Sequence, residues 1–272
     1  MSKVRAVTLL GVSGRMGQML VRTLAEFPDL ALVGATAAPG SRWVGCDAAQ
    51  VDGGAGASGI AITADPGEAL RGAAVAIEFA LPQATAANLA ACLSHRCPLV
   101  IGTTGHSAEV RQAIDAAAAQ LPILMAPNMS LGVNVLLKLA ALAAKALDDE
   151  YDAEVFEAHH RHKKDAPSGT ALAIGAAVAA ARGTTLQQSA VYAREGQTGP
   201  RARGTVGFSV MRAGDIVGEH VLTFAGGGER LEIAHRAHDR ASFARGALKA
   251  AQWLAGRPPG LYGMQDVLGL TE

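Results

Sequence analysis

Val7-Thr8-Leu9-Leu10-Gly11-Val12-Ser13-Gly14-Arg15-Met16-Gly17 places the pattern G-x-x-G-x-x-G between an apolar run and a segment with helical spacing. Ala6 to Leu10 predicts a strand buried on both faces, and Met16 to Phe27 carries apolar residues along one side of a helix. Glycines allow a tight turn, and the N-terminus of a helix offers N–H groups and a positive dipole to a pyrophosphate. The stretch therefore predicts the first strand-to-helix turn of a dinucleotide-binding domain. Its first glycine spacing is one residue longer than in G-x-G-x-x-G, so a bare structural turn is the alternative.

Short apolar runs alternate with helical segments through the first half of the chain. Strands are predicted at residues 30–34, 74–79, 99–101 and 123–125, and helices at residues 85–93 and 108–119. Alternation of this kind predicts an α/β fold built on a doubly wound parallel sheet.

The pattern changes near Asn128. Helices are expected at residues 131–147, 169–181 and 242–254, and strands at residues 152–158, 204–211, 216–224 and 230–237. The last three strands follow one another with short turns, which indicates an antiparallel or mixed sheet. The second half of the chain therefore predicts a separate α+β domain.

The composition excludes several classes of protein. Half of the 272 residues are hydrophobic, and 24 Lys and Arg balance 24 Asp and Glu, so no overall field attracts nucleic acid or an anionic membrane. The three cysteines show no CxxC spacing, which favours reduced thiols over a disulfide framework or a zinc site. No signal-peptide core precedes the first strand, and no apolar stretch is long enough to span a membrane. We expect a soluble, cytoplasmic protein.

The end of the second predicted strand bears on cofactor choice. An acidic residue normally stands there and binds the ribose hydroxyls of NAD, but Gly34 to Gly40 contains no acid. Arg42 either meets the 2′-phosphate of NADP or is a solvated loop residue, so the choice stays open. Gly102-Thr103-Thr104-Gly105 follows a later strand, where it either holds the nicotinamide ribose or is only a turn.

The densest chemistry lies in the segment Glu157-Ala158-His159-His160-Arg161-His162-Lys163-Lys164-Asp165-Ala166-Pro167-Ser168-Gly169-Thr170-Ala171. It follows a predicted strand and precedes a predicted helix. Ser168-Gly169-Thr170 would stand at the start of that helix, where amide N–H groups and two hydroxyls make an anion pocket. Basic side chains lie just upstream, so the segment predicts a site for a substrate that carries carboxylates.

Three other interpretations of this segment compete. A metal site would use His159, His160 and His162, with Glu157 or Asp165 as a further ligand, but the spacing is not H-E-x-x-H and the neighbouring lysines and arginine repel a cation. A nucleic-acid loop is disfavoured because no aromatic residue is interleaved with the basic ones. A solvated basic loop without function is the remaining alternative.

The segment from Glu157 to Ala171 is similar without a mismatch to E-x-H-H-x-x-K-x-D-A-P-S-G-T-A, the hallmark of the dihydrodipicolinate reductase family. Further landmarks of that family resemble this chain in order and place. They are residues 11–17, Gly102-Thr103-Thr104-Gly105, residues 128–134 and residues 212–220. The resemblance covers almost the whole chain.

The resemblance implies a Rossmann-type cofactor domain at residues 1–129, to which residues 241–272 return. It also implies a mixed-sheet domain at residues 130–240 that binds substrate and assembles a homotetramer. The implied reaction is the NADH- or NADPH-dependent reduction of 4-hydroxy-tetrahydrodipicolinate, a cyclic dicarboxylate, to tetrahydrodipicolinate in lysine and diaminopimelate synthesis. No metal, nucleic acid or membrane is implied.

The resemblance also implies roles for individual residues. His159 would be the acid/base residue and Lys163 the proton donor. The substrate would be held by His160, Ser168, Gly169 and Thr170. The cofactor would be held by Gly11, Val12, Ser13, Gly14, Arg15, Met16, Gly102, Thr103, Thr104, Ala126, Pro127, Asn128 and Met129.

The chain departs from the family pattern at two places. Many relatives have an acid, sometimes followed by Arg, where Ala38-Pro39 stands here, which leaves the cofactor preference in doubt. Many have Asp-Phe-Ser or Asp-Phe-Thr in place of Glu78-Phe79-Ala80, so a hydroxyl near the nicotinamide is lost.

Two rival functions remain to be weighed. Another two-domain dehydrogenase of amino-acid metabolism, such as an aspartate or homoserine dehydrogenase, would lack the intact His-His through Ser-Gly-Thr segment. A non-catalytic dinucleotide sensor is suggested by the missing ribose-binding acid. The retained His159 and Lys163 disfavour a sensor, because a sensor needs no proton donor beside an anion pocket.

Overall fold

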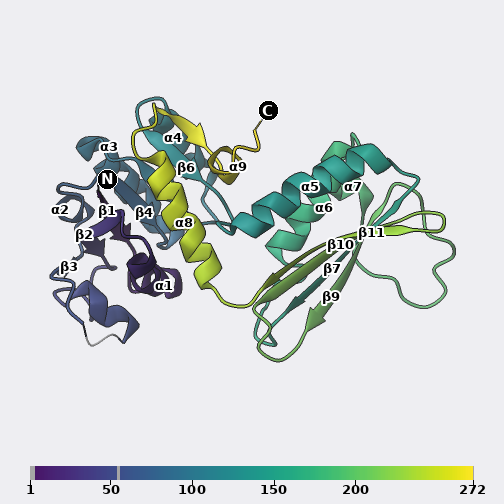
Figure 1. Cartoon of the computed structure of the whole chain (residues 1–272), viewed down its shortest axis with the longest axis horizontal. Helices are drawn as coiled ribbons and strands as arrows, with labels where there is room; N and C mark the ends of the chain where they lie inside the picture. The colour runs from purple at the N-terminus through teal and green to yellow at the C-terminus, as the bar shows by residue number, and fades with distance from the viewer. Residues whose placement is uncertain (1–3, 54–55, 272) are drawn as a thin grey trace. The chain divides into compact units, whose positions relative to one another are not determined.

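The computed structural model describes residues 4–53 and 56–271. The chain forms two compact units, Met1–Leu131 with Arg240–Glu272 and Gly132–Asp239. Figure 1 shows the helices and strands of each unit.

Unit 1 contains a seven-stranded sheet in which every neighbouring pair is parallel, in the order β12-β6-β5-β4-β1-β2-β3. The chain runs from β1 outward to β3 in one direction and from β4 outward to β6 in the other. This reversal is the doubly wound, Rossmann-type arrangement that the alternating pattern predicted. The strands are β1 (Arg5–Leu10), β2 (Leu30–Thr36), β3 (Ile62–Thr63), β4 (Val75–Glu78), β5 (Leu99–Ile101), β6 (Pro122–Met125) and β12 (Gly260–Tyr262).

Helices cover both faces of this sheet. Alternate strand residues feed two cores, because successive side chains of a strand point to opposite faces. Val7, Leu9 and Ile77 pack with α1 and α8, and Ile101 and Ile123 pack with α3 and α4. The helices are α1 (Arg15–Thr23), α2 (Pro66–Ala69), α3 (Thr85–His95), α4 (Ala108–Ala118), α8 (Ala241–Leu254) and α9 (Met264–Val267), with short 3₁₀ turns η1 (Leu24–Glu26), η2 (Ala48–Asp52) and η3 (Pro82–Ala84).

The glycine-rich turn brings backbone atoms into contact. Gly11 has a φ of +95°, and a Cβ there would lie 2.5 Å from the carbonyl oxygen of Phe79. Val12 N donates to the carbonyl of Thr36 over 2.8 Å, which joins the turn to the end of β2. Gly17 lies in the first turns of α1, where a Cβ would stand 2.3 Å from the carbonyl oxygen of Gly11. The absence of two side chains therefore lets β1, β4 and α1 meet at one point.

Unit 2 contains a five-stranded sheet in the order β11-β10-β7-β9-β8. Its strands are β7 (Asp152–His159), β8 (Ala190–Val191), β9 (Val206–Arg212), β10 (Gly218–Ala225) and β11 (Arg230–Ala237), and its helices are α5 (Leu131–Leu147), α6 (Gly169–Ala181) and α7 (Leu186–Ser189). β7 is parallel to β9 and antiparallel to β10, so the sheet is mixed. Although only residues 213–217 separate β9 from β10, β7 lies between them.

The helices of unit 2 gather on one face of its sheet. Leu136 and Ala140 of α5 and Ile174 of α6 share a core with Val155 of β7 and Leu222 of β10. The strand residues between these positions face the other side of the sheet, on which none of the helices described for unit 2 packs. One face is therefore core, and the other is open within the unit.

Gly17 and Gly14 offer a matched test of the turn. We expect Gly17→Ala to lower the free energy of unfolding by about 2 kcal/mol, because overpacking against backbone outweighs the ~1 kcal/mol that alanine gains in a helix. At Gly14 the nearest atom to an added Cβ is 3.6 Å away, so Gly14→Ala should change stability by no more than about 1 kcal/mol. Urea unfolding of both variants makes the comparison, and equal losses would contradict the packing argument.

Candidate active site

A cavity of about 860 Å³ opens at the carboxyl ends of the parallel strands of unit 1. Ligands of doubly wound sheets bind at this edge, beside the point where the strand order reverses. Its lining comes from the segments after β1, β2, β3, β4 and β5. The lining residues are Gly11, Ser13, Gly14, Arg15, Met16, Thr36, Ala37, Ala38, Pro39, Ala64, Pro66, Phe79, Ala80, Leu81, Pro82, Ala84, Ala87, Asn88, Gly102, Thr103 and Thr104.

The structure brings together most residues expected at the cofactor. Gly11, Ser13, Gly14, Arg15, Met16, Gly102, Thr103 and Thr104 all line the cavity. Val12 is fully buried beneath the turn. Ala126, Pro127, Asn128 and Met129 are not among the described lining residues, and Ala126 and Met129 lie in the core of unit 1. Sequence reasoning brought Ala38-Pro39 and residues 78–80 near the cofactor only as departures from the family pattern, and it did not expect Thr36, Leu81 or Pro82 at the cavity.

The floor of the cavity is shaped for close approach. At Gly102 a Cβ would lie 2.2 Å from the ring of Phe79, so that ring rests directly on the backbone. At the N-terminus of α1, the cap residue Gly14 makes no side-chain hydrogen bond, and the first turn holds no acid. The positive end of this helix is therefore unopposed by a carboxylate of its own first turn, as a pyrophosphate site requires. These features fit a dinucleotide.

No carboxylate is among the described residues that line the wall of the cavity after β2. Ala38 and Pro39 line the wall after β2, where a ribose-binding acid would stand. The guanidinium of Arg42 lies over the ring of Trp43, 4.7 Å from its centroid, and Arg42 is not among the described lining residues. Among the described residues that follow β2, none that lines the cavity carries a charge.

A buried carboxylate supports the cavity from below. Glu78, at the end of β4, is 0% exposed and accepts hydrogen bonds from Asn88 Nδ2 over 2.7 Å and Thr85 Oγ1 over 3.2 Å. Burial raises the pKa of Glu78, and the hydrogen bonds from these neighbours only partly oppose that shift. The carboxyl ties α3 to the strand that carries Phe79.

The segment Glu157 to Ala171 runs from the end of β7 through a loop to the start of α6, all within unit 2. Glu157 and His159 lie two residues apart on β7, so their side chains share the face that packs toward α6. Arg212 of β9 lies beside His159 in the parallel register, and Glu219 of β10 pairs with Ala158. The end of β7 therefore collects side chains from three strands and one helix.

The carboxylate of Glu157 is the centre of this cluster. It is fully buried, and the guanidinium of Arg212 binds it in a fork, with Nη1 2.7 Å from Oε2 and Nη2 2.8 Å from Oε1. Ser168 N donates to Oε1 over 2.9 Å, and His159 Nδ1 lies 2.6 Å from Oε2. Burial works to raise the pKa of Glu157, but these hydrogen bonds outweigh burial and hold the pKa below its ordinary value. Glu157 is therefore an anion.

Ser168 is the N-cap of α6. Its hydroxyl accepts from Ala171 N over 3.2 Å and lies 3.1 Å from His220 Nε2. Burial, together with repulsion from His159, lowers the pKa of His220 to about 4, so His220 is neutral near pH 7. Ser168 is only 2% exposed, and its side chain caps the helix; exposed Gly169 and partly buried Thr170 follow in the first turn.

Lys163 lies in the loop between β7 and α6. Its ammonium lies 2.8 Å from Asp165 Oδ1, and the Lys163 side chain is 21% exposed. The hydrogen bond from Lys163 holds the pKa of Asp165 below its ordinary value. Since Asp165 is largely exposed, water screens the pair, and an anionic ligand can compete for the ammonium. His160, in the same loop, is half-buried, and its ring lies 6.3 Å from that of His162.

The metal interpretation has no geometric support in the part of the chain that the structure describes. No group of three or more His, Cys, Asp or Glu there is arranged to hold a metal ion. His159, one proposed ligand, instead pairs with Glu157 and packs edge-on against His220 at 5.2 Å.

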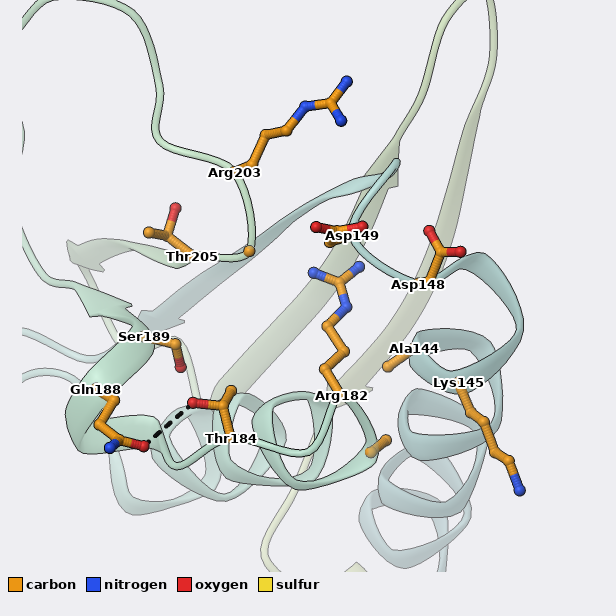
Figure 2. Close-up of a pocket in the computed structure, with 12 residues that line it drawn as sticks. Ala144, Lys145, Asp148, Asp149, Arg182, Thr184, Gln188, Ser189, Arg203 and Thr205 are labelled. Carbon is orange, nitrogen blue, oxygen red and sulfur yellow. Dashed lines mark hydrogen bonds between the residues drawn. The ribbon is translucent and has the colours of Figure 1, made fainter.

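A second cavity, of about 460 Å³, lies at the other end of the unit 2 sheet, near the start of β7 (Figure 2). Arg182 and Lys145 share its walls with the carboxylates of Asp148 and Asp149. Thr184 donates to Gln188 within the cavity. With the further basic residue Arg203, the cavity mixes charges of both signs, which suits a dianion less well than the basic turn before α6.

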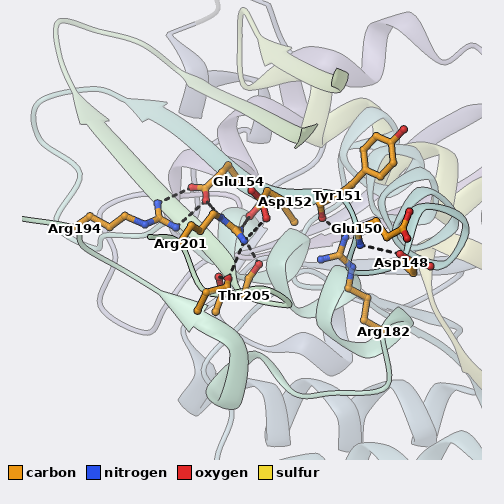
Figure 3. A network of polar contacts seen from close by, with 11 residues as sticks. Asp148, Glu150, Tyr151, Asp152, Glu154, Arg182, Arg194, Arg201 and Thr205 are labelled. Carbon is orange, nitrogen blue, oxygen red and sulfur yellow. Dashed lines mark hydrogen bonds and ion pairs between the residues drawn. The ribbon is translucent and has the colours of Figure 1, made fainter. Parts of the chain in front are cut away.

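Next to this cavity, an ionic network fastens the exposed segment 192–205 to β7 (Figure 3). Arg201 donates to Glu154, to Asp152 and to three backbone carbonyls, which satisfies the five N–H groups of its guanidinium. Arg194 binds both oxygens of Glu154, over 3.0 and 2.8 Å. The network is structural, because it lies at the opposite end of β7 from His159.

Sequence reasoning missed the partners that hold the cluster at the end of β7. Glu157 was considered only as a metal ligand, and neither Arg212 nor His220 was given a role. The one local signal that Glu157 and His159 share a face is their i, i+2 spacing, with Glu157 on the strand predicted at residues 152–158 and His159 directly after it. Arg212 and His220 come from strands whose register no local pattern reveals.

Comparisons with known proteins cover nearly the whole chain. The family model for the N-terminus of dihydrodipicolinate reductase matches residues 5–129, and the model for its C-terminus matches residues 132–268. The 4-hydroxy-tetrahydrodipicolinate reductase of Alkalilimnicola ehrlichii is 54% identical over 97% of this chain and 98% of that protein. The enzyme of the same name from Ruegeria pomeroyi is 52% identical over 99% of this chain and 100% of its own length.

Solved structures share the fold. The dipicolinate-bound dihydrodipicolinate reductase from Paenisporosarcina sp. TG-14 superposes with a TM-score of 0.77 at 24% identity, over 97% of this chain and 99% of that one. The amine dehydrogenase from Mycobacterium smegmatis gives a TM-score of 0.59 at 14% identity, over 94% of each chain.

Among the described residues, none of the helices has the length and apolar character needed to cross a membrane. Both halves match their family model, and the chain belongs to the dihydrodipicolinate reductase family.

Proposed function

We propose that this protein is a 4-hydroxy-tetrahydrodipicolinate reductase, which uses NADH or NADPH to form tetrahydrodipicolinate in lysine and diaminopimelate synthesis. Relatives with that name are more than half identical to it along nearly its whole length. One observation supports the proposal above all. The same chain has a cavity that fits a dinucleotide and a basic turn before α6. That turn contains Lys163 beside the exposed amide end of a helix, which suits a dianion.

The substrate site is proposed at the loop and first turn that follow β7. Cationic Lys163, the ring of His160 and the N-terminal residues Gly169 and Thr170 would hold the two carboxylates. Ser168 would contribute through the helix it caps, because its hydroxyl is engaged with Ala171 N and His220. Binding by several fixed donors orients the ring, which lowers the entropic part of the barrier.

The nucleotide is proposed to lie in the cavity of unit 1, against Gly11, Ser13 to Met16 and Gly102 to Thr104. When bound, reduced nicotinamide supplies a hydride to the electron-poor carbon of the substrate. The reduced substrate then carries enamine-like negative charge that must be protonated. Lys163 would stabilise this charge and donate the proton, and His159 would act as the acid/base residue that supports it.

The basic turn generates the first prediction for this function. Purified protein should oxidise NADH or NADPH only when freshly generated substrate is added, which a dinucleotide sensor would not do. Lys163→Ala should lower kcat by ~10²–10⁴-fold and raise KM much less, because a proton donor acts in the transition state. Exposed Lys164 provides the matched control, since Lys164→Ala removes an equal charge one residue away. Near-full turnover by Lys163→Ala would show that proton donation is wrongly assigned.

The second prediction concerns cofactor preference and Ala38, which lines the cavity wall after β2. Ala38→Asp places a carboxylate where it can accept from both ribose hydroxyls of NADH and repel the 2′-phosphate of NADPH. The ratio of kcat/KM for NADH to that for NADPH should rise roughly tenfold, equivalent to about 1.4 kcal/mol. Ala38→Ser, which adds a polar group without charge, should move the ratio far less. An unchanged ratio in Ala38→Asp would mean that the ribose does not lie against this wall.

We further propose that the protein assembles as a homotetramer through the open face of the unit 2 sheet, and that it works in the cytoplasm. Phe156 and Val221 are register partners on that face, and Met211, 44% exposed, lies near them. An apolar strip on a sheet face suits a further copy of the chain. Cys46, Cys92 and Cys97 are free thiols, which suits a reducing compartment.

Light scattering after size exclusion tests the assembly. The wild-type protein should have four times the mass of one chain, and Val221→Glu should yield smaller species because it buries a charge in the interface. Gln187→Glu, on exposed α7, adds the same charge away from that face and should leave the mass unchanged. A monomeric wild-type protein would refute the assembly.

A further inference from the structure

We propose that Glu157 is a positioning residue that fixes His159 in the tautomer with its proton on Nδ1, so that Nε2 exchanges the proton during the reaction. The functional meaning of this inference rests on the proposed role of His159 as acid/base residue. The tautomer itself follows from the geometry of unit 2 alone.

The hydrogen-bonding capacity of Glu157 is filled by its neighbours. An ionised carboxylate has about four acceptor positions. Oε1 accepts from Arg212 Nη2 and Ser168 N, and Oε2 accepts from Arg212 Nη1 and faces His159 Nδ1 at 2.6 Å. Because Arg212 and the amide have no alternative protonation state, they hold the carboxylate in the ionised form that only accepts. The proton between Glu157 and His159 must therefore come from the imidazole.

The opposite tautomer would be destabilised at this site. With its proton on Nε2, neutral His159 would point the lone pair of Nδ1 at an anionic oxygen 2.6 Å away. Two acceptors at that distance in a buried site repel each other and leave both unsatisfied. The ring orientation is also held from the side, because His220 packs edge-on at 5.2 Å.

The charged and titratable groups near His159 lie on several elements of unit 2. Glu157 lies on its own strand, Arg212 on β9, neutral His220 on β10 and His235 on β11, with Lys163 and Asp165 in the loop. Arg212 cancels most of the charge of Glu157, as the fork geometry maximises their attraction. The Arg212–Glu157 pair therefore presents an acceptor of reduced net charge to His159 Nδ1.

The other ring nitrogen faces a position without a side chain. A Cβ at Gly218, the first residue of β10, would lie 3.0 Å from His159 Nε2 and 3.4 Å from Cδ2. Gly218 is not among the described glycines with positive φ, so its backbone would tolerate another residue. The glycine keeps space beside the nitrogen to which we assign proton exchange.

Nitrogen NMR tests the tautomer directly. In ¹⁵N-histidine-labelled wild-type protein, at a pH where the rings are neutral, Nδ1 of His159 should have the shift of a protonated nitrogen and Nε2 that of an unprotonated one. The spectrum of His159→Asn assigns the signals by their loss. A His159 protonated on Nε2 would overturn the inference, and this readout does not depend on activity. If the ring of His159 is protonated on Nδ1 but Lys163→Ala does not lower kcat, the result would count against the proposed function and not against this inference.

Variants of Glu157 test whether the geometry matters for turnover. Glu157→Gln keeps the shape of the side chain but leaves Arg212 as an uncompensated cation beside His159, which disfavours the imidazolium. In the pH profile of kcat/KM, the part of the curve that requires protonated His159 should therefore move to lower pH by about one unit or more. The substitution should affect kcat more than KM. Glu157→Asp retains the charge and should restore this part of the curve toward its wild-type position. If activity falls in Glu157→Gln without movement of this part of the curve, Glu157 is only structural and the proposal fails.

Gly218→Ala provides an independent test from the opposite side of the ring. The added methyl group crowds Nε2 while leaving the Glu157 contact in place. Turnover should fall at least about tenfold while the NMR signature of the Nδ1-protonated tautomer persists. Unchanged turnover with a packed methyl group would show that Nε2 needs no space, which contradicts its assignment as the exchanging nitrogen.

Discussion

A buried anion, the carboxylate of Glu157, organises the end of β7 in unit 2. An isolated charge in a protein interior is strongly unfavourable, so its neighbours must supply compensating donors. Those donors come from Arg212 on β9, Ser168 at the start of α6 and His159 on β7 itself. Loss of one partner would leave the charge exposed to a penalty of about 3–5 kcal/mol. The same contacts that stabilise the unit therefore determine where the loop carrying Lys163 begins and ends.

The parts of the fold that could be predicted from the sequence are those with long or repeated local signals. The glycine turn and the apolar runs of β1, β4 and β5 indicated a doubly wound sheet, and α6 begins and ends at the predicted residues 169 and 181. β3 and β8 have only two residues, and β12, Gly260–Tyr262, lacks the continuous apolar run that made the equally short β5 detectable. The insertion of β7 between β9 and β10 is a non-local choice that turn signals cannot reveal.

In the candidate site too, residues close together in the chain could be predicted from the sequence, whereas those brought together only by the sheet could not. Residues contiguous in the chain, such as the segment from His159 to Thr170, could be predicted together because a strand-to-helix turn keeps them together. Thr36 and Phe79 line the nucleotide cavity only because parallel strands end at one edge of a sheet. Residues 126–129 also follow a strand of that sheet, yet Ala126 and Met129 pack into the core beneath α8 instead. End-of-strand position is thus a guide to a cavity but does not decide which side chains reach it.

The two units contribute different kinds of chemistry. Among the described residues that line the cavity of unit 1, Arg15 alone carries a charge, and Gly11 and Gly102 have no side chain where the neighbouring residue Phe79 comes close. Unit 2 holds the titratable cluster at the end of β7, where Glu157 and Arg212 offset each other and His220 is neutral. Nucleotide affinity should therefore depend on shape more than on pH near neutrality. The two residues proposed for proton transfer, His159 and Lys163, are both held by contacts to carboxylates of their own segment, Glu157 and Asp165.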